Sequence, residues 1–165
     1  MRKLNVLPNL MYLTLCILTF ACAPTPIVTG SPTALGIDSK LEAAIQQTRD
    51  TLDEFIAKIT TPRADRTFVA LKVRFYPPDE ASQDIWVDSV TYKNGVFRGD
   101  MGDDIPALKL EMGEKITIDE EDIVDWMIVE DGKLIGGYTI RLAVQRMSPE
   151  ERERFLETLD YSIED

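Results

Sequence analysis

Residues 67–98, TFVALKVRFYPPDEASQDIWVDSVTYKNGVFR, decide the fold. Apolar and polar side chains alternate along Thr67–Tyr76, and β-branched and aromatic residues are frequent there and in Ile85–Tyr92. Both features are typical of strands. Pro77-Pro78 interrupts the pattern and predicts a turn between them. The stretch therefore predicts two strands that follow each other closely along the chain.

The strand pattern continues downstream. Asn94-Gly95 predicts a tight hairpin, because both central residues of a type I′ turn need a positive φ. The Gly- and Asp-rich stretch 99–104 is expected to be a loop. The remaining strands are expected at Val96–Arg98, Lys115–Ile118 and Ile123–Glu130, with a short return partner at 134–135 after the Asp131-Gly132 turn.

Helices are predicted before and after the strands. From the Asp38 cap to about Ile59, apolar residues recur at three- and four-residue steps. Tyr138–Met147 also fits a helix, and Ser148-Pro149-Glu150-Glu151 combines the cap, proline and acids that begin another. We therefore predict an α+β fold, a curved antiparallel sheet of about five strands with one helix before it and two helices after it.

The first 21 residues are predicted to be a signal peptide. Arg2 and Lys3 precede twelve uncharged residues, Leu10–Ala21, which are fewer than the roughly 20 needed to span a membrane. Ala21-Cys22 resembles the end of a bacterial lipoprotein signal, in which Cys22 becomes the lipidated N-terminus. Cleavage after Ala23 without lipidation, or an uncleaved anchor, are the alternatives.

Residues 22–37 contain three prolines and two glycines and are predicted to be a flexible tether, with 38–165 as a single domain. The expected location is the bacterial cell envelope, with the domain lipid-anchored and facing the periplasm. Cys16 and Cys22 are the only cysteines and precede the domain. The domain is therefore expected to lack disulfides and cysteine metal sites.

Composition restricts the chemistry. The chain of 165 residues has 18 basic and 29 acidic side chains and no histidine, which excludes Ser-His-Asp and Cys-His nucleophiles and histidine-ligated zinc. Without residues 1–21, which hold two basic residues and no acid, the net charge becomes −13. Such a charge repels phosphate backbones, so no nucleic-acid partner is expected. Neither acidic run, 100–104 or 119–122, has EF-hand spacing, and no metal or cofactor is predicted.

Several motifs together resemble a known family. They are Val69–Phe75, Ile85-Trp86-Val87, Asp122–Ile128 and Gly136–Arg141, in this order. The chain resembles the YegJ-like bacterial family, catalogued as domain of unknown function 2314, from about Ala64 to Met147. Members usually carry Glu-His before the first tryptophan motif, where this chain has Gln83-Asp84. The resemblance supports the fold and implies no activity.

Gly136-Gly137-Tyr138, followed by Arg141, is the most suggestive candidate site. Two glycines allow close approach of the backbone, and a helix that begins there would direct free N–H groups outward. Tyr138 and Arg141 lie three residues apart and could bind a carboxylate or another anion. In the structural alternative, the glycines allow close helix–sheet packing and Arg141 pairs with Asp122 or Asp125.

Trp86 and Trp126 are the only tryptophans, and each is expected either to pack in the core or to form an exposed binding platform. The favoured function is a non-catalytic envelope module that binds a protein or a small anionic ligand around Trp86, Trp126 and Tyr138. The alternative is a small hydrolase in which Asp122 and Asp125 form a paired carboxylate and Arg141 holds an anionic substrate.

Overall fold

The computed structural model describes residues 38–164. The predicted signal peptide, the predicted lipidation site Cys22 and the predicted tether lie outside these residues. The helices are α1 (Ser39–Asp50), α2 (Leu52–Thr60), α3 (Tyr138–Arg146) and α4 (Pro149–Glu157). The strands are β1 (Arg66–Phe75), β2 (Gln83–Lys93), β3 (Val96–Met101), β4 (Lys115–Ile118), β5 (Ile123–Glu130) and β6 (Lys133–Gly136). None of the helices within 38–164 combines the length and apolar composition needed to cross a membrane.

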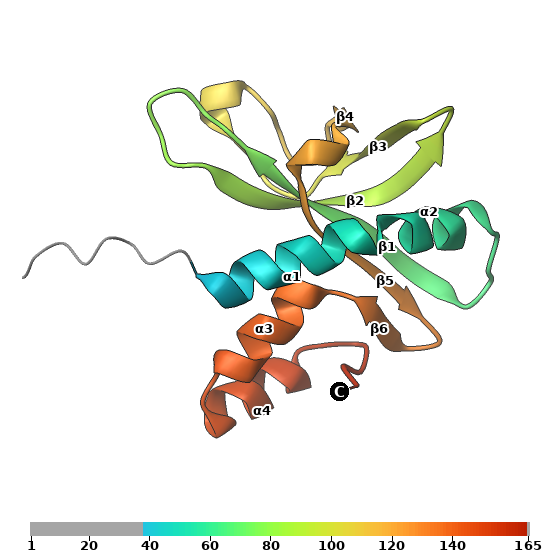
Figure 1. Cartoon of the computed structure of the whole chain (residues 1–165), viewed down its shortest axis with the longest axis vertical. Helices are drawn as coiled ribbons and strands as arrows, with labels where there is room; N and C mark the ends of the chain where they lie inside the picture. Colours follow the sequence, from blue (N-terminus) through green and yellow to red (C-terminus); the bar gives the residue numbers. More distant parts are fainter. Residues whose placement is uncertain (1–37, 165) are drawn as a thin grey trace, which may run out of the picture. The chain divides into compact units, whose positions relative to one another are not determined.

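The strands form one antiparallel sheet in the order β4-β3-β2-β1-β5-β6 (Figure 1). The predicted α+β class is confirmed, with six strands where about five were expected. The return partner expected at 134–135 is the full strand β6. Strand β3 extends into the expected loop at 99–104, because Gly99 and Asp100 pair with Ile116 and Lys115 of β4.

The two sheet faces carry different cores. Leu71 of β1 lies between Val87 and Trp126 in the register, and all three face the larger core, which Phe55 of α2 completes. The smaller core on the other face contains Ala70, Met127, Val129 and Leu134. Strand β5 is buried from Ile123 to Val129, so it serves both cores.

The helix predicted from Asp38 to about Ile59 is broken at Thr51, between α1 and α2. The Thr51 hydroxyl donates to the Gln47 carbonyl at 2.7 Å and accepts the indole N–H of Trp126 at 3.0 Å. A buried indole needs an acceptor for its N–H. Thr51 supplies it from the break, so the break and the core tryptophan are coupled.

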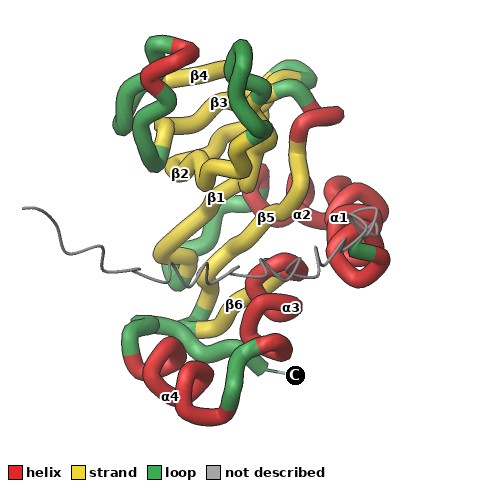
Figure 2. The backbone as a smooth tube through the Cα atoms, turned by 90° about the vertical axis from the view of Figure 1, so that its left-hand side faces the viewer, coloured by secondary structure: helices red, strands yellow, loops and turns green. Residues whose placement is uncertain are grey.

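The segment after α4 returns to the edge of the sheet. Ser162 accepts from the amide of Leu134 at 2.9 Å and donates its own amide to the Gly132 carbonyl at 2.8 Å, beside β6. Both views place α4 and the C-terminus at the β6 end of the sheet, away from β4 (Figures 1 and 2). The outer edge of β6 is therefore paired in part by the chain's own last residues.

Candidate functional site

The turn from β6 into α3 depends on two glycines. Gly136 and Gly137 have φ values of 72° and 66°, where side chains with a Cβ are strained. A Cβ on Gly136 would overlap the ring of Trp126, and one on Gly137 would lie 2.7 Å from Leu134 Cδ2. The amide of Gly137 donates to the Trp126 carbonyl at 2.7 Å. Close packing at the start of α3 therefore requires both glycines.

A carboxylate of the protein occupies the N-terminus of α3. Asp125 of β5 is fully buried and accepts the backbone amides of Tyr138 at 3.0 Å and Thr139 at 2.8 Å. It also accepts the Thr139 hydroxyl at 2.6 Å and the Trp126 amide at 2.9 Å. The first N–H groups of a helix attract an anion. The sequence expectation that they point outward to a ligand is wrong here, because Asp125 takes two of them.

Burial raises the pKa of the Asp125 carboxyl. Hydrogen bonds from the Thr139 hydroxyl and from the backbone amides oppose this rise, because each donor favours the ionised form. The hydroxyl of Thr48 on α1 lies 3.4 Å from the same carboxylate. Asp125 thus connects β5 with the beginning of α3 and the middle of α1.

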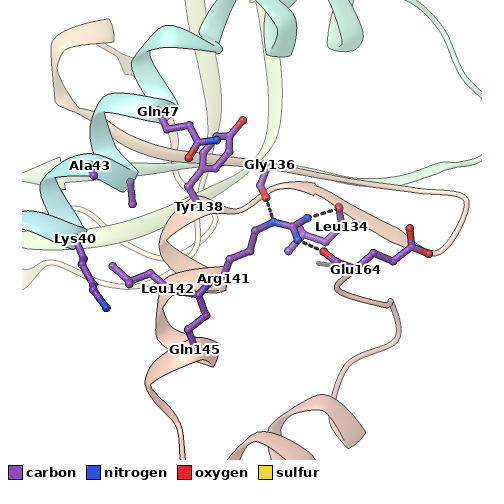
Figure 3. A pocket seen from close by; sticks show the side chains of 11 residues that line it. Lys40, Ala43, Gln47, Leu134, Gly136, Tyr138, Arg141, Leu142, Gln145 and Glu164 are labelled. Atoms are coloured by element: carbon purple, nitrogen blue, oxygen red, sulfur yellow. Dashed lines mark hydrogen bonds between the residues drawn. The ribbon is translucent and has the colours of Figure 1, made fainter.

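Arg141 is held by carbonyl groups. Its Nε donates to the carbonyl of Gly136 and its Nη2 to that of Leu134, each at 2.9 Å, and Nη1 donates to the carbonyl of Glu164 (Figure 3). These contacts satisfy three of the five N–H donors of a guanidinium. The expected pairing of Arg141 with Asp122 or Asp125 is not formed. Within residues 38–164 no ion pair neutralises the Arg141 charge.

Tyr138 and Arg141 line a cleft between α1 and α3. Its volume is about 690 Å³, within the usual range for small-molecule sites. Helix α1 contributes Lys40 and Gln47, and α3 contributes Gln145 (Figure 3). The sequence thus identified the α3 side of this cleft.

The α1 side was missed because its residues have no distinctive pattern. Lys40 and Gln47 are exposed residues of an amphipathic helix, and sequence analysis assigns such residues to the solvent face. Only the packing of α3 beside α1 turns them into the wall of a cleft. No local signal in the sequence could have found them.

The charge of the cleft differs from that of the chain. Lys40 and Arg141 are cationic and Glu164 is the acid among the lining residues, whereas the whole chain carries −11. Glu164 is also paired with Lys133, whose Nζ lies 2.8 Å from its carboxylate. The lining therefore combines a net positive charge with the amides of Gln47 and Gln145.

The tryptophans do not form one surface. Trp126 is 1% exposed, and its ring lies 5.3 Å from that of Phe55 and 5.7 Å from that of Tyr138. Trp126 therefore packs in the core, which is the first of the two positions expected for it. Trp86 pairs with Lys72 in the register and lies on the opposite sheet face, against the smaller core. A platform that joins Trp86, Trp126 and Tyr138 is not formed.

The paired carboxylate expected for a hydrolase has no geometric support. Asp125 is buried and accepts hydrogen bonds from Thr139 and from backbone amides, whereas Asp122 is half-buried in the 3-10 turn Glu120–Asp122 before β5. Within residues 38–164, no group of three acidic, histidine or cysteine side chains is arranged to hold a metal ion. The cleft is therefore the candidate site that the geometry supports.

Comparison with known proteins places the sequence among uncharacterised bacterial proteins. Residues 38–161 match the family described as "Uncharacterized protein conserved in bacteria (DUF2314)". The chain is 32% identical over 143 residues to the uncharacterized protein YegJ of Escherichia coli (strain K12), across 85% of this chain and 86% of YegJ. It is also 32% identical over 92 residues to a protein of Neisseria meningitidis serogroup B that is named as an ankyrin repeat protein, across 52% of this chain and 35% of that protein. No solved structure matches the chain.

Proposed function

The chain belongs to the DUF2314 family of uncharacterised bacterial proteins, and from that premise we propose that its domain is a non-catalytic module that binds a small anionic ligand in the α1–α3 cleft. The observation that carries this proposal is the joint position of Tyr138, Arg141 and Lys40 in one cleft of about 690 Å³.

The cleft favours a carboxylate ligand. A guanidinium suits planar carboxylates, and Arg141 keeps two N–H donors beyond its three carbonyl contacts. The carbonyl contacts fix its position before a ligand arrives, which reduces the entropy lost on binding. Lys40 adds a second charge from the opposite wall, and Gln47 supplies an amide for a further polar group.

The arrangement of the side chains in the cleft favours ligand binding over catalysis. The Tyr138 ring packs edge-on against Trp126, and Arg141 is held by carbonyls. The carboxylate of Glu164, the acid of the lining, is paired with Lys133. The buried Asp125 carboxylate is engaged by its donors at the start of α3. The cleft therefore offers charge and hydrogen bonds to a ligand without an acid–base pair.

Titration with citrate tests the proposal. Citrate is added to the ¹⁵N-labelled domain while sodium chloride keeps the ionic strength constant, and amide shifts are followed by NMR. We expect saturable shifts at Gly136 and Leu142. Lys40→Gln should weaken binding by about threefold, the effect of one exposed charge. Lys93→Gln, which removes an exposed lysine outside the cleft, is the matched control.

Absence of saturable shifts at constant ionic strength, or an equal loss of affinity in Lys40→Gln and Lys93→Gln, would contradict a specific anion site. Arg141 is unsuitable for the first test, because its removal also breaks its contacts with Leu134 and Gly136. Lys40 is exposed and can be changed without disturbing the core.

In this proposal the domain works in the bacterial cell envelope, attached to the membrane through Cys22 and exposed to the periplasm. The support is the uncharged run Leu10–Ala21 ending at Ala21-Cys22. Metabolic labelling with an alkynyl fatty acid should mark the wild type and Cys16→Ser, and leave Cys22→Ser unmarked. Equal labelling of Cys22→Ser, or no labelling of the wild type, would refute the anchor.

A further inference from the structure

A second, mainly apolar cavity lies beside the smaller core of the sheet. It has a volume of about 560 Å³ and shares no lining residue with the α1–α3 cleft. Phe68, Trp86, Phe155 and Tyr161 contribute four aromatic side chains to its wall. Phe68 is 40% exposed, which is high for a large apolar residue of a strand. The cavity thus presents aromatic surface that the fold does not bury.

Helix α4 forms part of the wall of this cavity. An amphipathic helix ordinarily buries its apolar face, yet every residue of α4 keeps some exposure, including Phe155, which lines the cavity and is only half-buried. The ends of the segment are nevertheless fixed, by the capping box of Ser148 and Glu151 and by the backbone bonds of Ser162 to β6. The space under α4 is therefore a defined feature of the fold.

The charges around the cavity indicate what enters it. Among the residues that line the cavity in the described part of the chain, one is charged. It is Asp160, which is exposed. Lys72 lies outside the lining, with its Nζ 5.5 Å from the centroid of the Trp86 ring. That ammonium group would repel a second cation placed beside Trp86, whereas a cation at Asp160 would be attracted. A negatively charged head group placed at Asp160 would be repelled.

We propose that the cavity under α4 binds an amphiphile that carries a positively charged ammonium group, with its apolar body among Phe68, Trp86 and Phe155 and its charge at Asp160. The apolar body supplies most of the affinity, because it covers aromatic surface now in contact with water. The charge at Asp160 selects the cation over an anionic amphiphile of the same length. This site is independent of the anion cleft.

NMR of the two tryptophan indole groups provides the test. The probe is dodecyltrimethylammonium below its micelle concentration, added to the full chain with Cys22→Ser, which blocks acylation. The Trp86 indole signal should shift saturably, while that of Trp126, which is 1% exposed and outside the cavity, serves as the internal control. Tetramethylammonium tests the head group alone, and dodecyl sulfate tests the chain with the opposite charge.

Matched variants separate the site from general attraction to an acidic protein. Phe68→Ser should weaken binding about tenfold, since it removes an apolar wall, whereas Tyr76→Ser should not, because Tyr76 is 64% exposed outside the cavity. Asp160→Asn should weaken binding about threefold, as for an exposed ion pair, with Asp103→Asn as its control. Asp160 is exposed, so its variant tests the site even if Phe68→Ser folds poorly.

Saturable movement of the Trp86 signal, with an affinity that is weakened in the cavity variants and unchanged in both controls, supports the proposal. Three outcomes overturn it: no shift of Trp86, equal affinity for dodecyl sulfate, or equal weakening by Asp160→Asn and Asp103→Asn. Because the probe and the variants differ from those of the citrate titration, either site can fail without affecting the other.

Discussion

Replacing Asp125 by asparagine changes only one carboxylate oxygen, and the structure predicts that the domain tolerates this poorly. One oxygen accepts the amides of Trp126 and Tyr138, and the other accepts the amide and hydroxyl of Thr139. An asparagine side chain must place its NH₂ group on one of these sides. The hydroxyl of Thr139 can rotate to accept, but a backbone N–H cannot. At least one buried amide therefore loses its acceptor and faces another donor.

The loss of stability in Asp125→Asn follows from the number of buried donors that lose their acceptor. A buried donor without a partner costs about 1–3 kcal/mol, and a hydrogen bond to a charged acceptor is worth about 1.5–3 kcal/mol. We expect Asp125→Asn to lower the free energy of unfolding by about 2–4 kcal/mol. Asp125→Ala, which leaves all of these donors unsatisfied, should lower it by about 3–5 kcal/mol.

Urea denaturation followed by circular dichroism measures the difference, with Asp122→Asn as the matched control. Asp122 is only half-buried, so its variant should unfold within about 0.5 kcal/mol of the wild type. If Asp125→Asn also unfolds within about 0.5 kcal/mol of the wild type, the prediction is refuted. That result would mean that the buried donors do not depend on a carboxylate.

Two further outcomes are expected. Hydrogen bonds from Arg146 and from the Leu41 amide lower the pKa of Asp38 to about 2. The stability from these contacts should therefore be present above about pH 4 and be lost toward pH 2, and the loss should be smaller in Arg146→Gln. Gly136→Ala should cost about 2–5 kcal/mol through positive φ and overlap with its neighbours, whereas Gly95→Ala, which has a φ of 78° and open space, should cost about 1–2 kcal/mol; equal thermal shifts would contradict the close approach.

Local patterns in the sequence were enough to predict most elements of the fold. Asn94-Gly95 predicted a turn with positive φ at both positions, and the structure has φ values of 53° and 78° there. Ser148 and Glu151 predicted the start of α4, where they form a capping box. These features depend on residues within a few positions of each other, which is the range over which turns and caps are determined.

The features that were missed depend on distant residues. Asp125 stands in a strand-like run, and its donors come from Thr139, fourteen residues later, and from Thr48, seventy-seven residues earlier. Thr51, at the break between α1 and α2, likewise accepts the indole N–H of Trp126, seventy-five residues later. Periodicity predicts which face of an element is apolar, but it does not reveal which polar group a distant segment will need.

The pairing of Ser162 with the edge of β6 also has a practical consequence for purified protein. A protease cut between Leu159 and Ser162 would detach the residue that accepts the Leu134 amide, and a hydrogen-bonding edge beside apolar Leu134 would be uncovered. Uncovered edges recruit strands from other molecules. A sample clipped there should form oligomers in size-exclusion chromatography while its helices and other strands remain folded.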